Sequence, residues 1–144
     1  MSVIEQTVVS LRQLFSTAPA KALHSSPSDD SWTAALIAAH LYDVDLVFGY
    51  NLRLALTEQH PQYVNYHEAN WALLPRLPFW QTLNAWESLR AGNLILMHHL
   101  VRTERSRDGD STQSDADDLI CELAAHDLGH IADTERALAD GLMK

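Results

Sequence analysis

The sequence predicts an all-α protein that folds as an antiparallel four-helix bundle. Four long segments place apolar residues three and four positions apart, which is the period of a helix with one apolar face. Prolines and turn-forming residues gather in the breaks between these segments, and no long stretch alternates polar and apolar residues as a strand does. Because each apolar stripe can be buried only against the others, a single bundle domain over residues 1–144 is expected.

Clear signals delimit the first two helices. Residues 2–17 are expected to form the first helix, on the spacing of Ile4, Val8, Leu11, Leu14 and Phe15. Pro19 and Pro27 then bracket a loop. The second helix is expected at about residues 32–59, after three residues of the kind that cap helices, Asp29, Asp30 and Ser31.

The third and fourth helices follow a long connection. The third is expected at about residues 78–105, with Pro78 in its first turn, and the fourth at about residues 115–143. Three acidic residues complement the dipole at the start of the fourth helix: Asp115, Asp117 and Asp118. The connection at residues 60–79 is long for a bundle, and connections of that length are often functional. Its aromatic residues predict that it packs against the helices: Tyr63, Tyr66, Trp71 and Phe79.

Charge and composition argue against several classes of protein. The chain carries 19 acidic and 10 basic residues, a net charge of −9, and this excess repels the phosphates of nucleic acids. No apolar run approaches the roughly 18 residues of a membrane span, and no polybasic segment would attract anionic lipids. With one cysteine and no signal-peptide layout at the N-terminus, a reduced, cytoplasmic setting is expected.

Three histidines are the candidate functional residues. His126 and His130 are four positions apart on the fourth helix, so both rings can reach one metal ion. Such a pair alone is a weak signal that arises easily by chance. His40, however, falls in the middle of the apolar stripe of the second helix, so the three rings point at or near one interior.

Two interpretations of these histidines stay open. Each could be a core residue with its own hydrogen bond, although burying three polar rings without a common partner is costly. A metal ion would satisfy all three rings, and three ligands leave a coordination position open, as in catalytic sites. Zinc, nickel and ferrous iron all suit three imidazoles.

Other polar residues of the second and fourth helices are weaker candidates. Asp43 and Asp133 could each orient an imidazole, although a solvated helix edge is the simpler interpretation. His67 could reach the mouth of the bundle, but a loop position without a role is simpler. Cys121 lies about 140° around the helix from His126 and is interpreted as a core thiol.

The third helix offers candidates for substrate contact. Arg90 and Asn93 are polar enough to touch a substrate. They share a helical stripe with Trp86 and Met97, however, and such a stripe is more simply explained by packing.

Three short motifs carry a resemblance to a known family. They are Ser31-Trp32, then Ala39-His40-Leu41 eight residues after the tryptophan, and His126-Asp-Leu-Gly-His130 near the C-terminus. With these motifs the chain resembles, over nearly its whole length, the DinB/YfiT-like family of bacterial metal-binding four-helix bundles. The resemblance implies that His40, His126 and His130 bind a divalent metal, often zinc or nickel. It also implies a homodimer, which is common in that family.

The resemblance leaves the reaction open. Some members of that family are transferases or isomerases that use a low-molecular-weight thiol, mycothiol or bacillithiol, and others are hydrolases. The first hypothesis is therefore a metal-dependent enzyme for a small-molecule substrate, in which the metal activates a water or a thiol. The alternative is a metal-binding bundle without turnover that serves in a stress response or an interaction. A carboxylate beside the open face of the metal would favour the enzyme, and a filled bundle mouth would favour the alternative.

Overall fold

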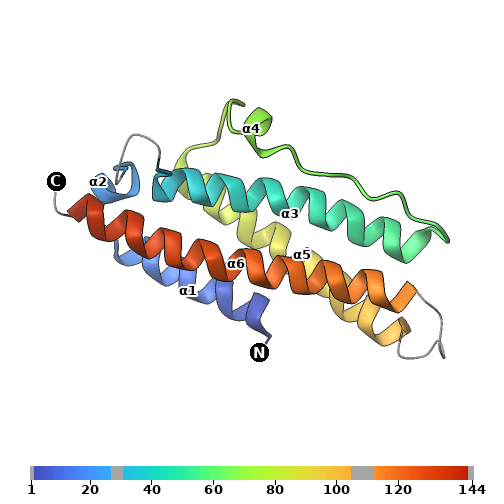
Figure 1. The fold of residues 1–144 in the computed structure, drawn as a ribbon. Coiled ribbons are helices and arrows are strands. Elements are labelled where there is room, and N and C mark those ends of the chain that lie inside the picture. Colours follow the sequence, from blue (N-terminus) through green and yellow to red (C-terminus); the bar gives the residue numbers. More distant parts are fainter. Residues whose placement is uncertain (1, 27–30, 105–111, 143–144) are drawn as a thin grey trace.

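The fold is all-helical over the part of the chain that the computed structural model describes, residues 2–26, 31–104 and 112–142. Its long helices lie alongside one another (Figure 1): α1 (Val3–Thr17), α3 (Ala34–Thr57), α5 (Phe79–Glu104) and α6 (Thr112–Leu142). Two four-residue helices lie in the connections, α2 (Ala20–Leu23) and α4 (Glu68–Trp71). The all-α class is confirmed, and the four long helices begin and end within a few residues of the expected positions. No helix in the described ranges is long and apolar enough to cross a membrane.

The cap of α3 differs from the expected one. The hydroxyl of Thr33 accepts the backbone N–H of Leu36 at 3.1 Å, so Thr33 caps the helix and Ser31 does not. The other two expected capping residues, at positions 29–30, lie outside the described residues. The side chain of Asp115, expected to support the start of the fourth helix, also lies outside what the structure describes.

Helices α3 and α5 run in the same direction. Leu41 and Leu83 share one buried cluster, and Phe48 and Met97 share the next, so positions increase together along the pair. Residues 58–78 return along α3 to reach the start of α5, which explains the length of this connection (Figure 1). The expected antiparallel arrangement therefore holds for α3 with α6 and for α5 with α6, but not for α3 with α5 or for α1 with α6.

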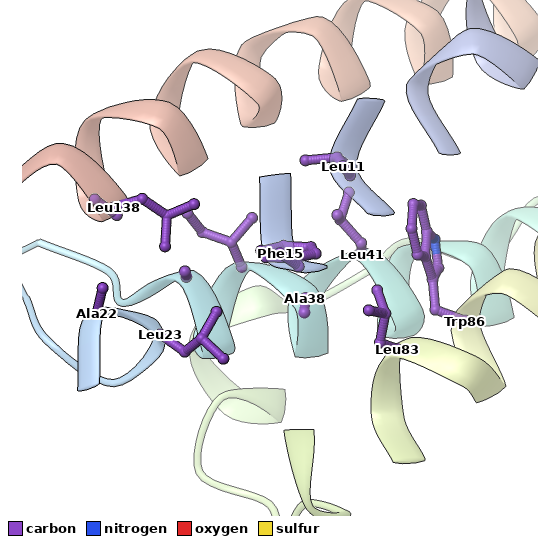
Figure 2. Packing of buried hydrophobic residues seen from close by; sticks show 12 residues of the cluster. Leu11, Phe15, Ala22, Leu23, Ala38, Leu41, Leu83, Trp86 and Leu138 are labelled. Carbon is purple, nitrogen blue, oxygen red and sulfur yellow. The ribbon is translucent and has the colours of Figure 1, made fainter. Parts of the chain in front are cut away.

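Buried apolar side chains form two clusters along the helices. The first lies at the end of the structure near α2 (Figure 2), and includes Leu11, Phe15, Ala22, Leu23, Ala38, Leu41, Leu83, Trp86 and Leu138. The second lies at the opposite end and consists of Ile4, Phe48, Leu52, Met97, Leu100 and Leu123. Because each cluster draws on all four long helices, burial of apolar surface holds the helices together at both ends.

A buried ionic network lies between the two clusters. The guanidinium of Arg90 is fully buried and donates to Asp45 of α3 at 2.7 Å and to Asp127 of α6 at 2.5 Å. The indole N–H of Trp86 and the amide of Asn93 also donate to the Asp45 carboxylate, at 2.7 and 2.9 Å. The substrate-contact interpretation of Arg90 and Asn93 is therefore wrong, since both side chains are enclosed in the core.

The close approach of α3 and α5 beside this network requires a glycine. A Cβ atom built on Gly49 would lie 2.2 Å from Oδ1 of Asn93. The Asn93 amide cannot easily move away, because its nitrogen is bound to both the backbone oxygen and the carboxylate of Asp45. Gly49 thus sets the distance between the two helices.

Removal of the central guanidinium should destabilise the protein strongly. We expect Arg90→Met to lower the free energy of unfolding by about 3–5 kcal/mol, because two buried carboxylates lose their counter-charge. Arg12→Met is the matched control. Arg12 lies 3.4 Å from Glu87 with 43% of its side chain exposed, so its loss should cost less than about 1 kcal/mol. Urea unfolding measures both variants, and equal losses would contradict the central role of the network.

Candidate functional site

The three candidate histidines meet in one cluster. His40 comes from α3 and is 5% exposed, and His126 and His130 come from successive turns of α6. Their ring centroids are 4.5 to 5.0 Å apart, and Nε2 of His40 lies 2.9 Å from Nε2 of His126. One ligand nitrogen from each ring lies within 4.8 Å of the others, so the three histidines could hold a metal ion. The predicted convergence of the rings is confirmed.

Trp32 closes one side of the cluster. Its indole stacks on the ring of His130, with centroids 5.9 Å apart and planes within 3°, and meets His40 edge-on at 4.8 Å. An aromatic wall of this kind restricts the orientations of both imidazoles and keeps water away from that side.

A hydrogen-bonded chain behind His40 selects its tautomer. The Tyr66 hydroxyl lies 3.2 Å from Nδ1 of His40 and 3.5 Å from the Asp43 carboxylate. The hydroxyl has one proton, and an ionised Asp43 can only accept hydrogen bonds. When Tyr66 donates to Asp43, it accepts from an N–H at Nδ1 of His40. This assignment leaves the lone pair of Nε2 facing the other two rings, where a metal would bind.

Arg76 completes this chain. Its guanidinium donates to Asp43 at 2.5 Å and to the backbone oxygen of Trp71 at 2.6 Å. Burial raises the pKa of Asp43, and Arg76 opposes that rise. Burial, together with the charges of Asp43 and Glu68, raises the pKa of Tyr66, so its hydroxyl keeps the proton that it donates. The interpretation of Asp43 as part of a solvated helix edge is therefore wrong. Asp43 orients His40 through the hydroxyl of Tyr66.

The other two histidines have carboxylates near Nδ1. Nδ1 of His126 lies 3.7 Å from Asp127, and Nδ1 of His130 lies 3.6 Å from Asp133. Both distances exceed a normal hydrogen bond, and neither buried nitrogen has a partner among the described residues. Asp133 is 46% exposed and binds Arg136 at 3.0 Å, so the solvated-edge interpretation describes it better.

The cluster passes a chemical test for a metal site. The 2.9 Å between Nε2 of His40 and Nε2 of His126 is short enough for both nitrogens to bind one ion at about 2.0–2.1 Å each. Without an ion, one N–H···N hydrogen bond accounts for that pair and leaves the third ring without a partner in the cluster. Separate hydrogen bonds, the simpler interpretation from sequence, are incomplete, because Nδ1 of His126 and Nδ1 of His130 also have no partner among the described residues. Nδ1 of His126 faces Asp127, so a metal on Nε2 would leave it unchanged.

His40 and His130 are held in the form that binds metals. Burial, with the neighbouring His130 and His126, lowers the pKa of His40 to about 3. Burial and His126 also lower the pKa of His130. Both rings are therefore neutral near pH 7, as a coordinating imidazole must be.

The cluster opens onto a pocket of about 610 Å³. This volume falls within the range of about 300–1,000 Å³ that is typical of small-molecule sites. His40 and His126 line one part of the pocket, and its walls come from α3, from α6 and from residues 63–66. The face of the cluster toward the pocket is therefore not filled by protein.

Hydrogen bonds fix the pocket wall at residues 63–66. The side-chain amide of Asn51 donates to the backbone oxygen of Val64 at 2.9 Å and accepts its N–H at 2.8 Å. Tyr66 is held by its contacts with His40 and Asp43. The prediction that this connection packs against the helices is confirmed at Tyr63, Tyr66, Trp71 and Phe79, which are all partly buried.

Several residues have roles or positions that the sequence did not indicate. Cys121 is exposed, so its interpretation as a core thiol is wrong; it lies about 200° around α6 from the buried Leu123. By contrast, His67 is exposed and does not line the pocket, which agrees with its simpler interpretation as a loop position. The sequence prediction did not include Asp127. Two signals could have indicated it: Asp127 lies between the two histidines of one motif, and a buried Arg90 needs a carboxylate partner.

Fold and site together define a class: an all-helical protein with three histidines from two helices that could hold a metal ion beside an open pocket. No family model and no solved structure matches the chain. A protein of Halalkalibacterium halodurans named a putative metal-dependent hydrolase is 30% identical over 115 residues, which cover 76% of this chain and 67% of that protein. The chain belongs to the same family as that protein.

The titration of His40 predicts how acid affects the metal-free protein. Its pKa is about 6.5 in the unfolded chain and about 3 in the folded one, so between these values the unfolded chain binds the extra proton. Stability should therefore be complete above about pH 6.5 and decrease as the pH falls toward 3.

The melting temperature of chelator-treated protein, measured from about pH 7 to about pH 4, checks this expectation. His40→Gln should show a shallower decrease with acid, whereas exchange of the exposed His99 for Gln should keep the original slope. An unchanged slope in His40→Gln would show that another group causes the acid sensitivity.

Proposed function

We propose that the chain is a metal-dependent hydrolase of the DinB/YfiT-like type, built as a four-helix bundle. His40, His126 and His130 would hold the divalent metal, with zinc or nickel as the first choice and ferrous iron next. One observation carries the proposal: three imidazoles from two helices converge beside a pocket of about 610 Å³. The name of the related protein from Halalkalibacterium halodurans supports hydrolysis as the reaction.

A bound divalent metal would supply a Lewis acid that lowers the pKa of a coordinated water towards about 7. The residues around it provide orientation and charge. Tyr66 and Asp43 hold His40 in the tautomer that presents Nε2. The fully buried carboxylates of Asp45 and Asp127, with one guanidinium between them, leave a net negative charge near the cluster that favours a cation.

Glu122 is the residue that we assign as the proton acceptor. It lines the pocket and precedes His126 by one turn of α6. A carboxylate beside the open face of the cluster is the feature that favours an enzyme over a metal-binding protein without turnover. The open pocket favours the enzyme as well, because a protein that serves only in a stress response or an interaction does not need one.

Other expectations from the resemblance stay proposals. A thiol-dependent transferase or isomerase would place its thiol on the same metal, but no feature of the described pocket identifies a thiol site. A small molecule remains the proposed substrate, and a homodimer in the cytoplasm remains the proposed state of the protein. Exposed apolar side chains that a second copy could cover lie around the start of α5: Leu73, Leu74, Leu77 and Trp80.

Metal content tests the ligand set. Protein purified without a histidine tag should contain about one zinc, nickel or iron per chain by elemental mass spectrometry, since three imidazoles form one site. We expect His126→Ala to lose most of this metal and His99→Ala, an exposed histidine outside the cluster, to keep it. Circular dichroism checks that both variants are folded. Equal metal content in the two variants would remove His126 from the ligand set.

Hydrolysis itself is tested with chromogenic esters and amides. The metal-loaded protein should cleave at least one of them, and chelation should abolish the activity until metal is restored. Glu122→Gln should lower kcat by about 100-fold or more with unchanged metal content, because it removes the proton acceptor. Glu135→Gln, on the exposed surface of the same helix, should leave kcat unchanged. Activity that survives complete removal of the metal would overturn the proposal.

A further inference from the structure

The lining of the pocket beside the histidines has a distinctive chemistry. Its floor is apolar and comes from α3 and α6: Val44, Val47, Phe48, Leu119 and Leu123. Two further aromatic side chains, Tyr63 and Tyr66, stand in its wall. Among the described residues, its charged lining residues are all acidic, Glu68, Asp118 and Glu122, and none is a lysine or an arginine. An apolar floor, aromatic rings and carboxylates thus surround one space.

This combination favours one sign of charge on the ligand. An anionic group would face three carboxylates without a basic side chain in the lining, on a chain with a net charge of −9. A cationic group would be attracted by the carboxylates and by the faces of aromatic rings, which bind ammonium groups. The pocket is therefore complementary to a molecule with a positive end and an apolar body.

The order of these residues along α6 gives the length of such a molecule. Asp118 precedes His126 by eight residues, which corresponds to a rise of about 12 Å along the helix. Leu119 and Leu123 lie between them and belong to the apolar floor. Glu122 also lies between them, one turn before His126, so a cationic end at Asp118 and a reacting end at the histidines would be separated by about two helical turns.

We propose that the pocket binds an organic cation: a substrate with a protonated or quaternary amine, an apolar middle and a hydrolysable bond near the histidines. Asp118 faces the amine, Glu68 adds negative charge near the histidine end beside Tyr66, and the floor formed by α3 and α6 holds the apolar middle. The inference rests on the proposed function, because the substrate of the hydrolase would occupy this same pocket.

Binding of three matched probes tests the proposal without requiring any turnover. The probes are 4-phenylbutylamine, 4-phenylbutanol and 4-phenylbutyrate, which share an apolar body and differ in the charge of one end. Calorimetry and NMR measure their affinities for the full chain as purified, after loading with zinc and after chelation. We expect the amine to bind at least about tenfold more tightly than the alcohol in all three preparations, and high salt to reduce this preference.

Variants with equal changes in net charge show which carboxylates cause the preference for the amine. Glu68→Gln combined with Asp118→Asn should remove the preference for the amine while the alcohol binds as before. Glu135→Gln combined with Asp140→Asn changes the net charge equally, away from the pocket, and should keep the preference. Equal affinities of amine and alcohol, or tighter binding of the butyrate to the chelated chain, would overturn the proposal.

The binding results can be distinguished from the results on metal content and hydrolysis. A chain that prefers the amine but neither holds metal nor cleaves esters would refute the hydrolase and keep the cation pocket. A chain that hydrolyses with metal but shows no amine preference would refute the cation pocket alone.

Discussion

The fold depends on one charged contact in its interior, the guanidinium of Arg90 between Asp45 and Asp127. Apolar clusters at the two ends hold the helices together, but apolar contact is non-directional and tolerates rotation of a helix about its axis. The guanidinium has fixed donor directions, and each carboxylate accepts from it only in a narrow geometry. The network therefore determines which faces of α3, α5 and α6 meet.

The candidate metal site follows from this constraint. Asp127 is adjacent to His126 on α6, and Asp45 follows His40 by five residues on α3. When Arg90 binds the two carboxylates, the two histidines are brought to the same level between the helices, where their Nε2 atoms approach to 2.9 Å. The site is thus a product of tertiary packing, and its stability and its geometry have the same origin.

The sequence predicted the features that depend on local periodicity. The four long helices and the convergence of His40, His126 and His130 follow from residue spacing along single helices, which a period of 3.6 determines. The short helices α2 and α4 were missed because four residues are too few to show a period. The interpretation of Cys121 as a core thiol was wrong because it depends on which face of α6 another helix covers. Arg90 and Asn93 lie in the core, as the packing interpretation of their stripe predicted. The ion pairs of Arg90 and the chain from Arg76 to His40 join residues more than 20 positions apart, which spacing alone does not indicate.

The connection that returns along α3 has a consequence for how such a protein can diversify. Helix α3 has 24 residues and spans about 36 Å, a distance that about eleven extended residues can cross. The chain uses residues 58–78 for the crossing, so about half of them exceed what the span requires. This excess forms α4 and the pocket wall that carries Tyr63, Tyr66 and Glu68. Insertions and deletions here would reshape the lining of the pocket while the helices and their histidines keep their positions, so the pocket can diversify separately from the histidine cluster.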